Sequence, residues 1–103
     1  MKEKRIDNLV SNKDSIAITF AAFRVANCFM YENFTSLIDI TVEQLQKIEN
    51  LKDEEINLDV LFKLYFIAQT QIDNPYREDY LKDFANKLKE KCYNEIKRRG
   101  NVK

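Results

Sequence analysis

Apolar and polar residues divide this chain into a few apolar segments separated by short polar breaks. The most apolar segment is 16–31, IAITFAAFRVANCFMY, in which only Thr19, Arg24 and Asn27 are neither apolar nor aromatic. A helix that is hydrophobic on nearly all sides is usually buried on nearly all sides. The pattern therefore predicts a central helix over residues 16–31, the least exposed segment of the chain, with the other segments packed around it.

Two other structures compete for this segment. Residues 16–20, IAITF, alternate and are β-branched as in a strand, but no other stretch offers a convincing partner strand. A membrane-spanning helix needs about 20 apolar residues, whereas this run has sixteen, with Arg24 near its middle. The run also starts late for a signal peptide, and no small-residue cleavage site follows it. The pattern favours a buried helix, capped by Asp14 or Ser15, in a cytoplasmic protein without a membrane span.

Two further helices follow in the middle of the chain. Thr41 and Gln44 have the spacing of a capping box, which opens a helix with Val42, Leu45 and Ile48 on one side. The next helix is expected over residues 58–72, because apolar residues recur there at helical spacing. Its predicted inner stripe is Leu58, Leu61, Phe62, Tyr65, Ala68 and Ile72, widened by Val60, Leu64, Phe66 and Ile67, which leaves Lys63, Gln69 and Gln71 for solvent.

The last helix is expected over residues 75–99. Pro75 suits a first helical position, Asn74 can serve as its cap, and Gly100 can take the left-handed conformation that ends a helix. Its inner stripe is Leu81, Phe84, Leu88, Cys92 and Ile96, and its outer face is charged, with Glu95 and Arg99 spaced for an ion pair. Elsewhere, residues 33–39 are expected to break the helices, with Phe34, Leu37 and Ile38 filling the core, and residues 1–13 suggest a short amphipathic helix.

Composition supports helices throughout. Glycine and proline occur once each in 103 residues, and sheets joined by tight turns usually need more of both. A chain of this length forms one domain. The fold class expected is therefore all-α: a single-domain bundle of about four helices over residues 1–103, with a possible short extra amino-terminal helix.

Charge and cysteine usage narrow the function classes. The net charge is zero, whereas a general nucleic-acid binder is normally basic. Residues 32–59 nevertheless hold eight acids and two lysines, and residues 89–103 hold six bases and two acids. This asymmetry indicates either solvated helix faces or a surface for a charged partner, including head-to-tail self-association. Cys28 and Cys92 both lie in apolar patterns, so both are expected to be buried, reduced thiols.

The residues argue against catalysis and against a bound cofactor. The chain has no histidine, which removes the usual general base and the usual zinc ligand. Its only glycine is Gly100, so no glycine-rich loop can hold a phosphate. Carboxylates at Asp53, Glu54, Glu55 and Asp59 are the remaining candidates for a hard cation. We expect a non-enzymatic protein with no cofactor and no physiological metal site.

Candidate binding residues lie near the two ends of the last helix. Tyr76, Arg77 and Tyr80 are the best candidates for an exposed aromatic patch, since aromatic residues and arginine are enriched at interface centres. Arg98 and Arg99 are expected at an exposed helix end that a charged partner can contact. In the central helix, Arg24 and Asn27 mark either a polar seam, with Arg24 paired to an acid such as Glu43 or Asp59, or a polar spot in a binding groove.

Two families show a resemblance. A chain rich in lysine, asparagine and isoleucine is typical of low-GC bacteria or their phages. FAAF at 20–23, NF at 33–34 and LFKLYFIA at 61–68 resemble phage tail assembly chaperones, and residues 61–91 are similar to the helical hairpin of bacteriocin immunity proteins. Neither stretch contains a diagnostic motif, so no family is assigned.

The function expected is that of a small, non-catalytic protein–protein interaction module: an inhibitor, adaptor or assembly factor, encoded by a phage or mobile element of a low-GC bacterium. Its partner is another protein or a second copy of the chain. The alternatives are a chaperone-like or immunity-like protein, a nucleic-acid-associated regulator that uses the basic carboxy-terminal end, and a small enzyme or ligand-binding bundle. Neutral charge weakens the regulator, and the missing histidine and glycine weaken the enzyme.

Overall fold

The computed structural model describes residues 14–35 and 38–100, and these residues form a bundle of helices without strands. The elements in chain order are α2 (Ile16–Ala26), α3 (Tyr31–Thr35), α4 (Val42–Ile48), the 3-10 turn η2 (Asp53–Glu55), α5 (Leu58–Ile72) and α6 (Asp79–Gly100). The predicted all-α class is confirmed. The helix suggested within residues 1–13 and the core position suggested for Leu37 lie outside the described residues.

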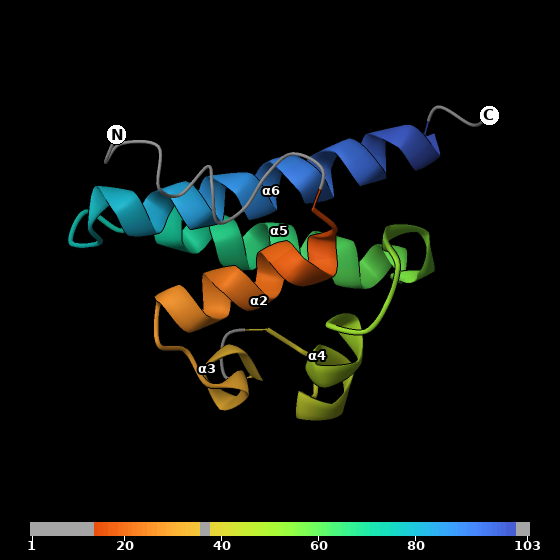
Figure 1. Cartoon of the computed structure of the whole chain (residues 1–103), viewed down its shortest axis with the longest axis horizontal. Coiled ribbons are helices and arrows are strands. Elements are labelled where there is room, and N and C mark those ends of the chain that lie inside the picture. The colour runs from red at the N-terminus through yellow and green to blue at the C-terminus, as the bar shows by residue number, and fades with distance from the viewer. Residues whose placement is uncertain (1–13, 36–37, 101–103) are drawn as a thin grey trace.

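The bundle is built on a pair of long helices. Helices α5 and α6 form an antiparallel hairpin and lie side by side along their length, while α2 crosses in front of them and packs on α6 (Figure 1). The short helices α3 and α4 lie together on the other side of α2. The core fills the space between these layers and includes Phe20, Phe23, Phe34, Leu45, Ile56, Leu61, Leu64, Ile67, Phe84 and Leu88.

The amino-terminal end of α2 is fixed as the sequence predicts, but its other end is not. The Ser15 hydroxyl accepts a hydrogen bond from the Ile18 amide, which satisfies a free donor of the first turn. The helix then ends at Ala26, five residues before the predicted end at Tyr31. A separate short helix, α3, occupies part of the stretch where a break was predicted.

A Schellman motif explains the early end of α2. The Phe29 amide donates to the Arg24 carbonyl at 2.9 Å and the Cys28 amide to the Val25 carbonyl at 3.0 Å, which satisfies the last carbonyls of the helix. Cys28 takes the left-handed conformation, with φ of 57°, where glycine is usual. The rings of Phe23 and Phe29 then meet at 6.1 Å, which supplies the hydrophobic contact that accompanies this motif.

Helix α5 has the predicted bounds, but its sides are used differently from the prediction. Leu61, Leu64, Ile67 and Ala68 are buried, together with Gln71, which was expected in solvent. Lys63 is partly buried and donates to the Asp39 carbonyl oxygen. By contrast, Leu58, Phe62 and Phe66, which were expected in or beside the core stripe, are exposed. The predicted apolar stripe is wider than the side of α5 that the neighbouring helices cover.

Helix α6 begins at Asp79, four residues later than predicted. The Asn74 side chain does act as a cap, but it accepts from the Tyr76 amide and closes a turn around Pro75 rather than opening the helix. At the other end, Gly100 is the last helical residue and does not have a positive φ, so the predicted left-handed cap is wrong. The capping box of Thr41 and Gln44 at the start of α4 is confirmed.

Polar contacts fasten η2 to the start of α2 and the end of α6. The Asp53 carboxylate accepts from the Ile16 amide at 2.8 Å, so a residue distant in sequence caps the first turn of α2. Arg99 donates to the Asp53 carbonyl at 2.9 Å, and Lys91 donates to the Asp14 carbonyl at 2.9 Å. These contacts hold three segments together at one end of the bundle.

Candidate protein-interaction surfaces

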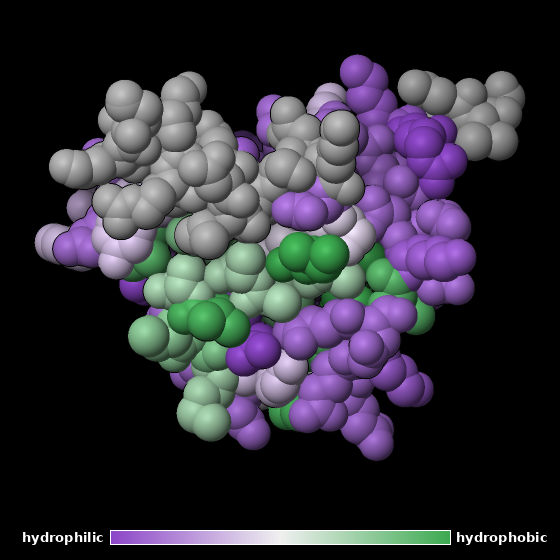
Figure 2. Space-filling view, viewed as in Figure 1, coloured by the Kyte–Doolittle hydropathy of each residue, from purple (hydrophilic) through white to green (hydrophobic). Residues whose placement is uncertain are grey.

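The side of α2 that points away from the core carries only apolar side chains. Ile18 and Val25 are 54% and 64% exposed, and Ala21 and Ala22 lie between them, partly exposed. These four residues, here called the α2 outer face, recur at i, i+3, i+4 and i+7, the spacing of a helix–helix contact. Figure 2 shows the apolar side chains gathered over α2 on the front of the molecule.

The prediction that the central segment is buried on nearly all sides is therefore wrong for this face. The buried residues of α2 are Ile16, Ala17, Thr19, Phe20 and Phe23. Ala22 and Ala26 are partly buried and pack against the edge of the core. The sequence itself contained an indication that one side of this helix is exposed. A helix that is apolar all round needs neighbours on every side, and few helices of this small chain are available to cover it.

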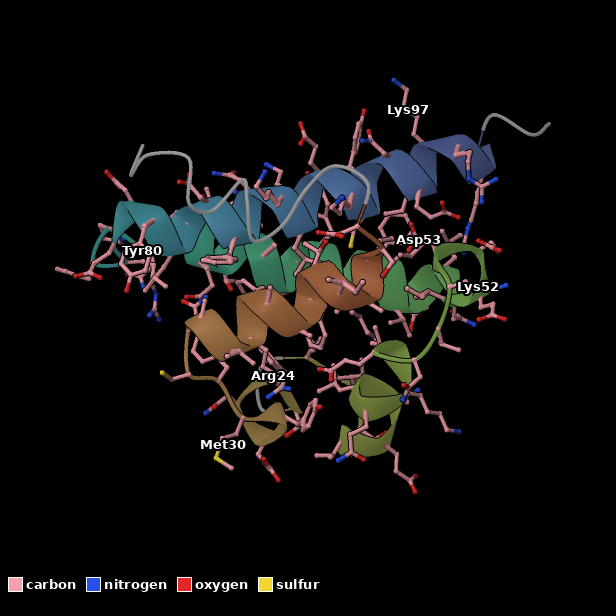
Figure 3. The ribbon with its side chains drawn as sticks, viewed as in Figure 1. Arg24, Met30, Lys52, Asp53, Tyr80 and Lys97 are labelled. Carbon is pink, nitrogen blue, oxygen red and sulfur yellow. The ribbon has the colours of Figure 1, made fainter. Side chains whose placement is uncertain are left out.

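Arg24 leaves the outer face by turning toward α4. Its Nε donates to the Glu49 carboxylate at 3.0 Å, and its guanidinium lies 4.3 Å from the centre of the Tyr31 ring. Tyr31 in turn donates to Glu49 at 3.0 Å, and burial together with this carboxylate raises the pKa of the phenol. The paired, polar-seam interpretation of Arg24 is confirmed, but the partner is Glu49 rather than Glu43 or Asp59. Figure 3 shows Arg24 on the side of α2 toward α3 and α4.

Asn27 belongs to the core rather than to a surface groove. It is buried, and its side-chain amide donates to the Phe23 carbonyl at 2.9 Å. Its Oδ1 atom has no hydrogen-bond partner among the described residues. An unsatisfied buried oxygen of this kind lowers stability.

The loop after Asn27 carries two exposed sulfur-containing side chains. Cys28 and Met30 are exposed, and Met30 points away from the bundle beside α3 (Figure 3). The prediction of a buried thiol is therefore wrong for Cys28, because the left-handed turn directs it out of the helix pattern. It is confirmed for Cys92 on α6, where burial raises the pKa of the thiol to about 12.

The predicted aromatic patch at the start of α6 is exposed, but its arginine is engaged. Tyr76 is 92% exposed and Tyr80 is more than half exposed. The Arg77 guanidinium donates to the buried Gln71 side chain at 3.1 Å and lies 5.4 Å from the centre of the Phe29 ring. Arg77 thus holds the loop to α5, while Tyr76 and Tyr80 remain available to a partner.

The other predicted binding residues, Arg98 and Arg99, are held within the molecule. Both donate to Glu95, Arg98 at 3.0 Å and Arg99 at 2.8 Å through their Nε atoms. Glu95 was expected on the outer face, but it is buried, and the two arginines hold the pKa of its carboxyl below the ordinary value. The side chain of Arg98 is 58% exposed and that of Arg99 only 23%, so the expectation of an exposed pair is wrong for Arg99.

The same end of the bundle contains a shallow charged depression of about 210 Å³, lined by Asp14, Asp53, Lys91, Asn94, Glu95 and Arg98. Several of these side chains make the contacts that join η2, α2 and α6, which gives them a structural role. Within the described parts of the chain, no three histidine, cysteine or carboxylate residues are placed to hold a metal ion together.

Comparison with other proteins identifies no relative: no family model, curated protein or solved structure matches this chain. The resemblances to phage tail assembly chaperones and bacteriocin immunity proteins gain no support from these comparisons. Across residues 14–35 and 38–100, no helix has both the length and the apolar character to cross a membrane. A function for this molecule must therefore be argued from its own surfaces.

Proposed function

We propose that this protein is a non-catalytic protein–protein interaction module that binds an amphipathic helix of another protein on the α2 outer face. The observation that carries the proposal is the unbroken run of apolar side chains at Ile18, Ala21, Ala22 and Val25. Contiguous exposed apolar surface on a small protein commonly marks a binding site.

The shape of the face supports a helical partner. The two alanines lie between two larger side chains, so the backbone of a second helix can approach α2 closely at its middle, with Ile18 and Val25 on either side. The four positions span about 10 Å along the helix, at 1.5 Å per residue. A partner helix with apolar residues at the same spacing can cover this length with two turns.

The rival function, nucleic-acid binding through the basic carboxy-terminal end, has less support. Arg98 and Arg99 already bind the Glu95 carboxylate, and Arg99 also binds η2. Phosphate contacts need arginines and lysines that can reach the backbone of the nucleic acid. The proposed class includes inhibitors, adaptors and assembly factors, and the identity of the partner will distinguish them.

The test is an affinity pull-down from the native host with three versions of the chain. These are the wild type, I18S/V25S, and a matched control, D83S/E90S, that changes two exposed residues of α6. We expect the wild type and the control to retain the same partner and I18S/V25S to lose it. Thermal melts should show that all three fold, because serine has a helix propensity similar to those of isoleucine and valine.

Recovery of the same partner by I18S/V25S would contradict the proposal. The proposal would also be contradicted if the folded wild type recovered no partner. Nucleic acid that copurifies with the wild type and is lost in an R98S variant would favour the rival function.

A further inference from the structure

A chain of hydrogen bonds links the carboxy-terminal end of α6 to the first turn of α2. The Glu95 carboxylate accepts from the Nε atom of Arg99 at 2.8 Å, and another guanidinium nitrogen of Arg99 donates to the Asp53 carbonyl at 2.9 Å. The Asp53 carboxylate then accepts from the Ile16 amide at 2.8 Å. Figure 3 shows Asp53 beside the start of α2, on the side toward α6. The first turn of α2 therefore depends on groups that belong to η2 and α6.

The segment that carries Asp53 is attached to the bundle by few apolar side chains. Of residues 49–57, only Ile56 is buried, and Leu51 is partly buried. An element with little buried apolar surface and exposed polar contacts opens at a lower free energy than the rest of a fold. Residues 52–57, here called the η2 latch, are therefore the part of this end of the bundle that we expect to open first.

The groups next to α2 in sequence do not replace Asp53 as a cap. The Ser15 hydroxyl accepts from the Ile18 amide, and the Ser15 carbonyl accepts from the Thr19 amide. The Ile16 amide instead donates to Asp53, 37 positions away in the chain. The Ile16 residue is fully buried, so an amide without an acceptor at this position is costly unless the turn frays and water reaches it.

We propose that the η2 latch controls the order of the first turn of α2, and that Glu95 keeps the latch closed by positioning Arg99. In the closed state, Asp53 holds the Ile16 amide, and the turn that carries Ile18 is ordered. In the open state, this amide loses its acceptor and the turn frays. Ile18 is the first residue of the α2 outer face, so an open latch leaves that face without one of its two larger side chains in a fixed position.

The regulatory consequence rests on the proposed function, because it requires a partner helix on the α2 outer face. A partner that binds the ordered turn better than the frayed turn shifts the latch toward its closed state. By linkage, contacts that close the latch strengthen the binding of that partner by the same factor. Any group that draws Arg99 away from Asp53 therefore weakens binding at a surface that it does not touch.

The test is native-state amide hydrogen exchange, followed by NMR on isotopically labelled protein. In the wild type, the amides of Ile16 and Ile18 should be less protected than those of Leu64 and Leu88 in the α5–α6 hairpin. Their exchange should also depend less on urea, because local opening exposes less surface than global unfolding. D53A removes the acceptor of the Ile16 amide, and we expect exchange at Ile16 and Ile18 to become about fivefold faster.

Two further variants of the latch show whether the Asp53 side chain acts as a cap. D53N keeps an oxygen that can accept from Ile16, and its exchange rates should stay close to those of the wild type. E54A is the matched control, since it changes an exposed neighbour in the same turn, and it should leave the rates at Ile16 and Ile18 unchanged.

A double-mutant cycle tests the positioning role of Glu95. E95Q alone should speed exchange at Ile16 and Ile18, because it weakens the hold on Arg99. The same change in a D53A background should add little, since the effect of Glu95 on this turn passes through Asp53. A purely structural contribution of Glu95 would instead add fully to that of D53A.

The consequence for binding is tested in the pull-down with the native host. D53A should recover less of the partner than E54A does. If the wild type recovers no partner, the proposed function of α2 fails, and the exchange rates still decide whether the latch exists.

Three results of the exchange experiment would overturn the inference. These are unchanged exchange at Ile16 and Ile18 in D53A, equal urea dependence of these amides and those of Leu64 and Leu88 in the wild type, and additive effects of D53A and E95Q. Equal recovery of a partner by D53A and E54A would overturn the coupling between the latch and the α2 outer face.

Discussion

Helices α2 and α6 pack against each other, yet they use their residues in opposite ways. Helix α2 is apolar on almost every side, and only one side of it is covered by the core. Helix α6 is charged over most of its surface and buries a narrow stripe, Leu81, Phe84, Ala85, Leu88, Cys92 and Glu95. Helix α6 buries its stripe of apolar residues in the core, whereas α2 has more apolar residues than the core buries.

The two helices also differ in the polar contacts that they make with other segments. Near the end of α6, Lys91 and Arg99 reach backbone oxygens of other segments, and Glu95 binds two arginines. On α2, Arg24 forms an ion pair with Glu49 at 3.0 Å. The apolar surface of α2 that the core leaves exposed is the basis of the proposal that α2 binds a partner.

The two thiols should give the largest contrast between the helices. Cys28 lies exposed just after α2, and Cys92 is buried on α6. A rise of the Cys92 pKa from 9.0 to about 12 makes its thiolate about a thousandfold scarcer. We expect a thiol reagent to label Cys28 rapidly and Cys92 only on unfolding, as mass spectrometry of timed samples can measure. Rapid labelling of both thiols under native conditions would contradict the structure.

The two sides of α2 should differ strongly in their effect on stability. Phe23→Ala removes a ring from the core and should lower the free energy of unfolding by about 3–5 kcal/mol. Val25→Ala, two residues away on the outer face, should change it by no more than about 0.5 kcal/mol. Urea denaturation of both variants measures the difference. A large loss in Val25→Ala would mean that the outer face is covered in the free protein.

The ion pairs of α6 should contribute a smaller amount that depends on pH. Glu95→Gln weakens the hydrogen bonds from Arg98 and Arg99 and should cost about 1–3 kcal/mol at neutral pH. Since the pKa of Glu95 is lowered in the folded state, its contribution is fully present above the ordinary value of 4.5 and is lost as pH falls through the lower, folded value. Urea denaturation across this range should show the two proteins converging in acid, and a gap independent of pH would argue against the ion pairs.

A substitution at the end of α2 should give the smallest change in the free energy of unfolding, and this change should be an increase. Cys28 holds a left-handed conformation that costs a residue with a side chain about 1–2 kcal/mol. Cys28→Gly removes this strain but adds backbone freedom to the unfolded chain, so we expect a net gain of about 0.5–1 kcal/mol. Cys28→Ala is the matched control, since it removes the thiol and keeps the Cβ atom, and it should show no gain in thermal or urea denaturation. Equal gains in both variants would assign the effect to the thiol.

Several features of the fold could be predicted because their causes are local. The bounds of α5, the cap at Ser15 and the capping box of Thr41 and Gln44 depend on residues within one or two turns. The end of α2 was harder to predict, because Cys28 replaces the glycine that normally signals a left-handed cap. The buried position of Glu95 depends on two arginines and on a neighbouring turn, which the spacing of residues along α6 does not reveal.

The candidate surfaces divide in the same way: features with local causes could be predicted, and features that depend on tertiary packing could not. The aromatic patch of Tyr76 and Tyr80 was predicted as exposed and is exposed, with Tyr76 in the polar loop and Tyr80 in the first turn of α6. The α2 outer face and the ridge of Phe62 and Phe66 were assigned to the core, because apolar residues at helical spacing normally face inward. The ion pair of Glu95 with Arg99 was predicted from their spacing and is confirmed, but both residues were assigned to the solvent-facing side, and the second bond to Glu95, from Arg98, was missed.

The sequence by itself determined that this chain forms helices, where most of them begin, and which residues are apolar. The tertiary structure decided which apolar sides are covered and which charges meet. The physical reason is that helical periodicity reports the polarity of each side of a helix, whereas burial depends on whether another helix is near enough to cover that side. In this small bundle, α2 and α5 each have apolar side chains that the other described helices leave exposed.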